Sequence, residues 1–235
     1  MKIKSKFTSN EYKLDFDDVR IVPITSKFES RKDIQLKTGY IFPRSEIDWT
    51  GIPIIAANMD NVATFDMARA LQNYSICTAL TKFHTPNQWS EAIISGVSLD
   101  YSFITFGLDS ISSIERCLNN INNQTGTIPK IVVFDVPNGY IKPFHRILAD
   151  FRKQYPKFGI IAGNIVTPEG VQILSDCGVD AVKIGIGSGS ACSTSNITGV
   201  GYPQLSAVLE CAEIAEDLKV LTVSDGGAKS SGDIS

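Results

Sequence analysis

The sequence predicts an α/β protein of the TIM (β/α)8-type barrel class, with seven of the eight barrel strands recognisable. From residue 52 onward, short runs rich in β-branched residues alternate with longer, more polar segments of helical periodicity. The short runs are apolar on both faces, which is typical of parallel strands in βαβ units. Polar residues and glycines follow nearly every run, and in a barrel the carboxyl ends of the strands form one active face.

The predicted strands and helices follow each other in regular order. Pro168 and Pro203 stand where the first turn of a helix tolerates proline, and each precedes an apolar pattern at helical spacing. The predicted strands cover residues 52–57, 75–80, 101–106, 130–135, 158–163, 181–184 and 220–224. The predicted helices cover residues 65–73, 87–95, 111–119, 143–155, 168–177 and 203–218.

A doubly wound open sheet is the competing fold, but it would place its chemistry at one switch point. Polar or glycine residues at seven strand ends favour the barrel. The sequence ends at Ser235, soon after the seventh predicted strand, whereas a closed barrel needs an eighth strand. We therefore expect a barrel without its eighth strand and C-terminal flap region, either as a fragment or as a chain completed in another way.

Residues 1–50 are predicted to form an N-terminal arm and a small β layer. Residues 1–15 are polar and charged, which suits an arm over the surface. Residues 26–50 contain short alternating runs that indicate a hairpin or a loop layer. The second predicted region, residues 51–235, is the barrel itself.

The composition fits one soluble globular domain or two small ones. The chain has 235 residues, of which 43% are hydrophobic and 20% charged, with a formal net charge of -3. No Lys or Arg block recurs along one face, so nucleic acid and anionic membranes are not expected partners. We see no signal peptide, and no apolar stretch reaches the ~18 residues of a membrane span. We expect a cytoplasmic protein.

The cysteines predict one reactive thiol rather than a disulfide framework or a zinc site. The five cysteines are an odd number without a C-x-x-C pair, which suits a reducing compartment. Cys192 ends a loop with glycines at 185, 187 and 189, where nearby backbone N–H groups favour a thiolate. The other four lie in apolar or helical segments and are interpreted as small buried hydrophobes. The glycine spacing alone is weak evidence, since it is also found in tight βα turns.

Longer motifs around this loop resemble a known family. The run that begins Gly185-Ile-Gly-Ser-Gly-Ser-Ala-Cys-Ser-Thr194 and continues to Val208 closely resembles the catalytic loop of the IMP dehydrogenase and GMP reductase superfamily. Three features resemble the reductase branch: the absence of an inserted regulatory domain, and the motifs Ile54-Ile-Ala-Ala-Asn-Met-Asp60 and Tyr202-Pro-Gln-Leu-Ser-Ala-Val208. Further family blocks match in the right order at 135–140, 162–167 and 224–227, so the resemblance covers nearly the whole chain from Leu14 onward.

The resemblance implies reductive deamination of GMP to IMP and ammonia with NADPH. Cys192 would attack C2 of the purine and form a covalent thioimidate, which hydride from NADPH then releases as IMP. Thr194 matches the family's proton-transfer threonine, whose relay partner in the family is a glutamate that we expect outside this chain. The family assembles as tetramers, so a homotetramer is expected.

The resemblance also assigns residues to the substrate and to a potassium ion. GMP contacts are expected at Met59 on the purine, at Asp225 on the ribose, and at Ser190, Gly226 and Gly227 near the phosphate. Hard cations prefer oxygen ligands, and a K+ site is expected at Gly187, Gly189, Cys192 and Ser195.

The nicotinamide cofactor is expected to contact residues from several segments. Arg31 and Lys82 suit a phosphorylated ribose and hence NADPH. Thr81 and Phe83 stand where the family usually has histidines, so the choice between NADPH and NADH stays open. Other departures are Pro137, Ser195, Asn196 and Ala228, and none removes the nucleophile. The expected contacts are Ser30, Arg31, Lys82, Asp135, Val136, Pro137, Ile186 and Gly187.

Two other functions stay open on the sequence. One is oxidation of IMP to XMP with NAD, which would need a mobile flap with an Arg-Tyr pair that this chain does not supply. The other is a truncated, inactive paralogue that binds a nucleotide or a partner subunit. Its support is the early end of the chain after the seventh predicted strand.

Overall fold

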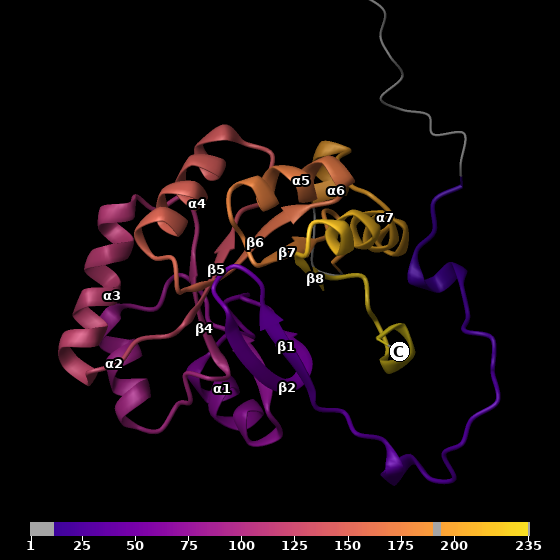
Figure 1. Cartoon of the computed structure of the whole chain (residues 1–235), viewed down its shortest axis with the longest axis horizontal. Helices are drawn as coiled ribbons and strands as arrows, with labels where there is room; N and C mark the ends of the chain where they lie inside the picture. Colours follow the sequence, from indigo (N-terminus) through magenta and orange to yellow (C-terminus); the bar gives the residue numbers. More distant parts are fainter. Residues whose placement is uncertain (1–11, 190–193, 235) are drawn as a thin grey trace, which may run out of the picture.

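The computed structural model describes residues 12–189 and 194–234, which form one sheet with helices around it (Figure 1). The strands are β1 (Thr38–Phe42), β2 (Ile47–Ala56), β3 (Ile76–Ala79), β4 (Ser102–Phe106), β5 (Ile131–Asp135), β6 (Gly159–Ile165), β7 (Ala181–Ile184) and β8 (Leu221–Ser224). The helices are α1 (Phe65–Leu71), α2 (Pro86–Ile94), α3 (Ile111–Thr125), α4 (Lys142–Gln154), α5 (Pro168–Asp176), α6 (Thr194–Thr198) and α7 (Gln204–Asp217). Short 3-10 helices are η1 (Phe16–Asp18), η2 (Arg31–Asp33), η3 (Gln72–Tyr74) and η4 (Ser231–Asp233).

The strands β2 to β8 run parallel and pair in chain order, with a helix between each strand and the next. This is the barrel-type fold that the sequence predicts, and each predicted strand overlaps one of these seven. β8 pairs with β7 only, and no described residue forms a further parallel strand beside it. The barrel-type fold is therefore confirmed, with β8 at one edge of the described sheet.

An antiparallel hairpin of β1 and β2 packs at the amino end of the barrel strands. Phe42 of β1 is buried in the inner core, and a Cβ placed on Gly159 at the start of β6 would lie 3.0 Å from its ring. β2 has two partners along its length, since Gly51 pairs with Thr38 of β1 whereas Ile52 pairs with β3. The boundary predicted after residue 50 thus falls inside a strand that the hairpin and the barrel share.

Two apolar cores lie on the two faces of the sheet. The outer core, between strands and helices, contains large side chains such as Trp89, Phe134 and Phe144. The inner core is smaller, and Ile131 and Val133 of β5 contribute to it. Successive residues of a strand point to opposite faces, so both faces of these strands are apolar. This double burial explains why the sequence shows continuous apolar runs instead of alternation.

Hydroxyl side chains cap four of the helices. Thr64, Thr85, Ser110 and Thr167 each accept a hydrogen bond from the backbone N–H three residues later, at the start of α1, α2, α3 and α5. Pro168 stands in the first turn of α5, as predicted, where no backbone donor is lost. None of the helices in the described part of the chain is long and apolar enough to cross a membrane.

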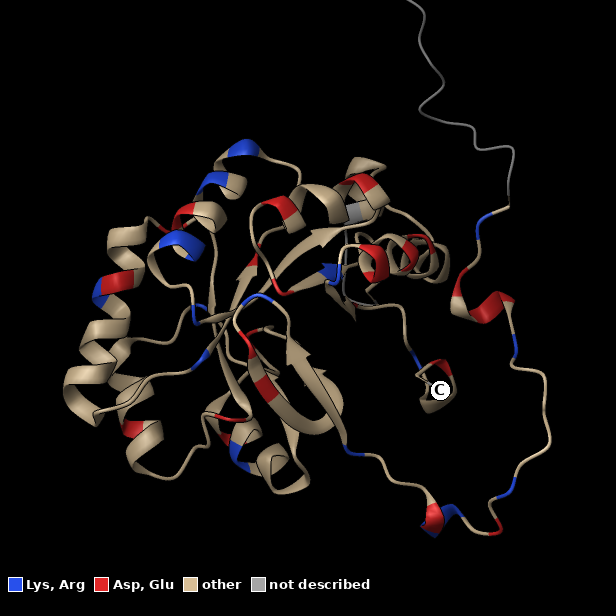
Figure 2. Cartoon of the chain, viewed as in Figure 1, with Lys and Arg blue, Asp and Glu red and all other residues tan. Residues whose placement is uncertain are grey.

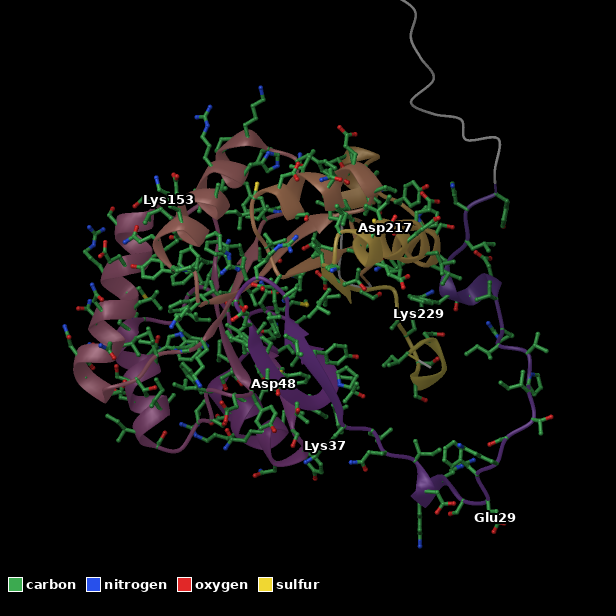
Figure 3. The ribbon with its side chains drawn as sticks, viewed as in Figure 1. Glu29, Lys37, Asp48, Lys153, Asp217 and Lys229 are labelled. Carbon is green, nitrogen blue, oxygen red and sulfur yellow. The ribbon has the colours of Figure 1, made fainter. Side chains whose placement is uncertain are left out.

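The outside of the molecule carries charges of both signs (Figure 2). The segment from residue 19 to residue 37, which we call the arm, lies away from the sheet and its helices (Figure 1). Glu29 and Lys37 mark two points along the arm (Figure 3). Almost every residue of this segment is exposed, so packing against the barrel contributes little to its position.

Asp180, directly before β7, is a buried carboxylate with several partners. Its Oδ2 accepts from Arg152 Nη2 at 2.5 Å and from the Ile160 backbone N–H at 2.8 Å. Its Oδ1 accepts from the backbone N–H groups of Arg44 at 2.7 Å and Ser45 at 2.9 Å. Burial lowers the pKa of Arg152, and the negative charge of Asp180 opposes that shift. One carboxylate therefore joins the β1–β2 turn, α4, β6 and β7.

We expect Asp180→Asn to lower the free energy of unfolding by about 3 kcal/mol or more, because Arg152 would stay buried without its anionic partner. Urea unfolding followed by tryptophan fluorescence measures the difference. Asp150→Asn removes an exposed carboxylate from α4 and is the matched control, with an expected change below about 0.5 kcal/mol. Equal stability of the two variants would contradict this role of Asp180.

Candidate active site

Residues from three strand ends meet at one buried ammonium group. Lys183 lies in β7 and is 7% exposed. Its Nζ forms an ion pair with Asp135 at the end of β5, and a second one with Asp225 Oδ2, after β8, at 3.1 Å. It also donates to Asn58 Oδ1, after β2, at 3.3 Å. The carboxyl ends of these strands thus form one polar site, at the position where a barrel carries its active face.

The two carboxylates keep Lys183 charged. Burial by itself would lower the pKa of this ammonium, but the charges of Asp225 and Asp135 outweigh burial and raise it. The folded chain therefore holds this proton more tightly than the unfolded chain. This contribution to stability is complete below the ordinary lysine pKa of ~10.4 and is lost as the pH rises through the folded-state value.

Asn164 connects Asp225 to the glycine loop that follows β7. Its Nδ2 donates to Asp225 Oδ2 at 2.7 Å and to the Gly185 carbonyl at 2.7 Å. Its Oδ1 is buried and has no hydrogen-bond partner among the described residues. Buried acceptors are normally paired, so this oxygen is an exception among the polar atoms of the site.

Close backbone contact joins the loops after β7 and β8. Gly185 has a φ of 152°, and a Cβ there would lie 2.1 Å from the Asp225 carbonyl oxygen. Gly226 and Gly227 both have positive φ, and a Cβ on Gly226 would lie 3.1 Å from Gly189. Only glycine combines this conformation with so little space. Two of the predicted substrate residues, Asp225 and Gly226, therefore pack directly against the glycine loop, whereas Gly227 lies against Gln204 of α7.

One cavity of about 360 Å³ lies beside Asp135, and we call it the β5 cavity. Four predicted cofactor residues line it together: Lys82, Asp135, Val136 and Pro137. A Cβ on Gly107 would lie 3.4 Å from Lys82 Nζ, so the lysine reaches over the end of β4. The cavity thus combines one cation and one carboxylate with apolar walls, to which Leu108 and Ile141 contribute.

A second cavity of about 360 Å³, the loop cavity, lies between the glycine loop and residues 15–17. The predicted cation residues Gly187 and Ser195 line it, and Ser195 Oγ donates to the Gly187 carbonyl at 3.4 Å. Gly227 lines the same cavity. Among the described residues, no group of three or more His, Cys, Asp or Glu side chains is placed to hold a metal ion.

The segment 13–17 is held over α7 by polar contacts. Asp15 Oδ1 accepts from the Gln204 backbone N–H at 2.6 Å, where the first turn of α7 has unsatisfied donors. Leu14 N–H donates to Ser206 Oγ at 2.8 Å, and Asp17 forms an ion pair with Lys229. The outer wall of the loop cavity is therefore built from the start of the described chain.

Several predicted residues are not brought to this site. Ser30 and Arg31 lie on the arm and are exposed, without a hydrogen bond to the barrel. Met59 is 49% exposed in the turn after β2 and lines neither cavity. Ile186 is 8% exposed and its side chain packs in the outer core, so only its backbone is available to a ligand.

Three predicted residues cannot be placed in the site geometry by their side chains. Cys192 and Ser190 lie outside the described residues. Thr194 begins α6, but its side chain is not described. Gly189 is described, and it contacts the loop after β8 next to Gly226.

Sequence reasoning missed Lys183, Asn164 and Asn58 as site residues. A signal for Lys183 was present, because a lysine inside the apolar run 181–184 must be buried and hence needs partners. Asn164 and Asn58 follow predicted strands, where polar residues are expected, but their partners are far away in the sequence. Only the folded chain identifies which of these contacts form.

Gly185→Ala should lower the free energy of unfolding by about 2 kcal/mol or more, since its Cβ would overlap the Asp225 carbonyl. Thermal unfolding and urea titration measure the loss. Gly39→Ala in β1 is the matched control, because the nearest atom to its new Cβ would be Thr50 Oγ1 at 3.6 Å. A Gly185→Ala variant as stable as this control would show that the two loops do not need their close contact.

Comparisons with known proteins identify the family. The model of the IMP dehydrogenase / GMP reductase domain matches residues 106–235. GMP reductase of Caenorhabditis elegans is 43% identical over 96% of this chain and 63% of its own length. GMP reductase 2 of Bos taurus is 44% identical over 96% of this chain and 64% of its own.

A solved structure supports the same relationship. The crystal structure of inosine 5' monophosphate dehydrogenase from Legionella pneumophila superposes with a TM-score of 0.78 at 28% identity, over 95% of this chain and 65% of that protein. The chain spans slightly less than two thirds of the length of each of these relatives. The domain match and these identities show that the chain belongs to the IMP dehydrogenase/GMP reductase family.

Proposed function

We propose that the chain acts in GMP reductase, which converts GMP to IMP and ammonia with NADPH in purine nucleotide interconversion. The observation that carries this proposal is the identity of 43–44% to proteins named GMP reductase over 96% of this chain. The chemistry needs a thiol and polar binding groups: Cys192 is the proposed thiol, and the site around Lys183 has two carboxylates.

The proposed reaction starts at Cys192. Its thiolate attacks C2 of GMP, and the bond from C2 to the exocyclic nitrogen breaks as ammonia leaves, which gives a thioimidate. A nicotinamide cofactor, when bound, would supply the hydride to C2, and breakage of the C–S bond would return the Cys192 thiolate and release IMP. Thr194 is proposed to move the proton to the leaving amino group, with a relay partner because a hydroxyl is a weak acid.

The choice of Cys192 as nucleophile is supported by the other four cysteines. Burial raises the pKa of Cys117 to about 11 and that of Cys211 to about 12. Burial also raises the pKa of Cys77 and Cys177. These thiols carry very little thiolate near neutral pH, so they cannot act as efficient nucleophiles.

The substrate is proposed to bind along the loops after β7 and β8. Asp225 would accept from the ribose hydroxyls, and Gly226, Gly227 and Ser190 would hold the phosphate. Two adjacent glycines with positive φ can present backbone N–H groups to an anion without a side chain in the way. Met59 is proposed to cover the purine.

The β5 cavity suits the nicotinamide half of NADPH. Val136, Pro137 and Leu108 form an apolar wall for the ring, and Asp135 can accept from ribose hydroxyls. Lys82 supplies a positive charge for a phosphate. Ile186 and Gly187 are proposed to contribute backbone contacts. Ser30 and Arg31 are the remaining proposed contacts, and they stand on the arm.

A potassium ion is proposed at the glycine loop, with carbonyls of Gly187, Gly189 and Cys192 and with Ser195. The Ser195 hydroxyl lies near the Gly187 carbonyl, so oxygen donors of the kind that hard cations prefer are present. The ion would fix the loop and thereby the position of Cys192.

A homotetramer in the cytoplasm is the proposed form of the enzyme. Ile21, Val22 and Ile24 on the arm are 74–87% exposed. Exposed apolar groups of this kind favour contact with a second surface, which supports association through the arm.

Cys192→Ala should abolish NADPH oxidation in the presence of GMP, because no thioimidate can form. The decrease of NADPH absorbance with GMP measures this, and binding of GMP by calorimetry should remain. Cys117→Ala, which removes a cysteine on α3, is the control and should keep nearly full activity. Full turnover by Cys192→Ala would exclude the covalent mechanism.

The same assay separates the competing functions. Reduction of NAD with IMP and no reaction with GMP would identify an IMP dehydrogenase, whose relative in the structural comparison is only 28% identical. No turnover in either direction with nucleotide binding intact would identify an inactive binding protein.

Limiting iodoacetamide at pH 7.5 should alkylate Cys192 well before the other cysteines, since the raised pKa values keep those as thiols. Peptide mass spectrometry over time measures each rate, and added GMP should protect Cys192. Equal alkylation rates at Cys192 and Cys117 would contradict an activated thiol.

A further inference from the structure

Lys183 contacts both carboxylates that the proposed function assigns to different ligands. Its Nζ pairs with Asp135, the proposed cofactor residue, and with Asp225, the proposed ribose acceptor. We propose that Lys183 is a positioning residue, whose ammonium group fixes the positions of both carboxylates. It thereby aligns the substrate half of the site with the cofactor half. This inference rests on the proposed function and adds a residue to its machinery.

The hydrogen-bond capacity of Lys183 is used completely inside the protein. An ammonium has three N–H donors, and Nζ has three acceptors: Asp135 Oδ1, Asp225 Oδ2 and Asn58 Oδ1. No donor is left for a substrate, and the side chain is 9% exposed. Lys183 therefore acts through the carboxylates and does not contact the reacting atoms.

The two carboxylates need a cation between them. Both lie within ion-pair distance of the same nitrogen atom, so they are close to each other. Two carboxylates at such a distance repel each other and either separate or take up a proton. Either response would remove an ionised acceptor from one of the two ribose-binding positions. Lys82 also lines the β5 cavity with Asp135, but no ion pair joins Lys82 to either carboxylate in the described chain.

The surrounding backbone leaves Lys183 little freedom. A Cβ on Gly163, its partner in β6, would lie 2.6 Å from Lys183 Cβ and 2.6 Å from its carbonyl oxygen. Asn164, the next residue, donates to the same Asp225 oxygen, Oδ2, at 2.7 Å. The lysine stem is thus enclosed at close range, and its charged end reaches one fixed point between β5 and β8.

The kinetic test compares Lys183→Met, Lys183→Arg and the control Lys153→Met. Lys153 stands on the outside of α4, far from the strand ends (Figure 3). Loss of the charged hydrogen bonds in Lys183→Met should raise KM for GMP and KM for NADPH by about ten-fold or more each. Lys183→Arg keeps the charge and should recover part of both values, whereas Lys153→Met should match the wild type. A change confined to one KM, or to kcat alone, overturns the proposal.

A second measurement does not depend on nucleotide binding. NMR titration of lysine 13Cε signals follows Lys183 in the wild type, in Asp135→Asn and in Asp225→Asn. Each substitution removes one negative charge beside the ammonium, so the pKa of Lys183 should fall in both variants. An unchanged pKa in either variant overturns the shared position of Lys183. A wild type that binds neither nucleotide overturns the proposed function instead, and this titration still tests the geometry.

Discussion

The ion pair between Asp180 and Arg152 is the contact that holds the amino end of the sheet together. Asp180 is fully buried and binds groups from α4, β6 and the β1–β2 turn. Lys183, three residues later in the same segment, donates to acceptors at the carboxyl ends of β2, β5 and β8. In barrels the amino face serves stability and the carboxyl face serves chemistry. In this chain the buried charge at the amino face is Asp180, directly before β7, and the buried charge at the carboxyl face is Lys183, within β7.

Much of the fold could be predicted because the strands are apolar on both faces. Continuous runs such as 131–135 and 181–184 have no exposed side to interrupt them, and the hydroxyl caps of the helices are local signals. The division of β2 between two partners could not be predicted. Its register depends on β1 on one side and on β3 on the other, and neither partner can be identified from the residues of β2.

The site could be predicted only in part, for a related reason. Lys82, Asp135, Val136 and Pro137 were expected together, and they line one cavity. Lys183, Asn58 and Asn164 were not expected, because their contacts join residues from 21 to 125 positions apart. Asp15 meets the start of α7 across 189 positions. A motif identifies the residue types within one segment, whereas these contacts form only when the fold places a second, distant segment beside it.

The sheet holds Asp135, in the cofactor half of the proposed site, more firmly than it holds Asp225, in the substrate half. Asp135 ends β5, whose other residues are buried and which pairs with a strand on each side. Asp225 follows β8, whose residues alternate between partly buried and exposed and which pairs only with β7 among the described strands. Its carboxylate is held by the ion pair with Lys183 and the hydrogen bond from Asn164. Its backbone is held by the hydrogen bond from its N–H to the Ile184 carbonyl and by the close contact with Gly185. The carboxylate that follows this half-exposed strand is thus held by groups from the better-packed strands β6 and β7, of which Lys183 also holds Asp135.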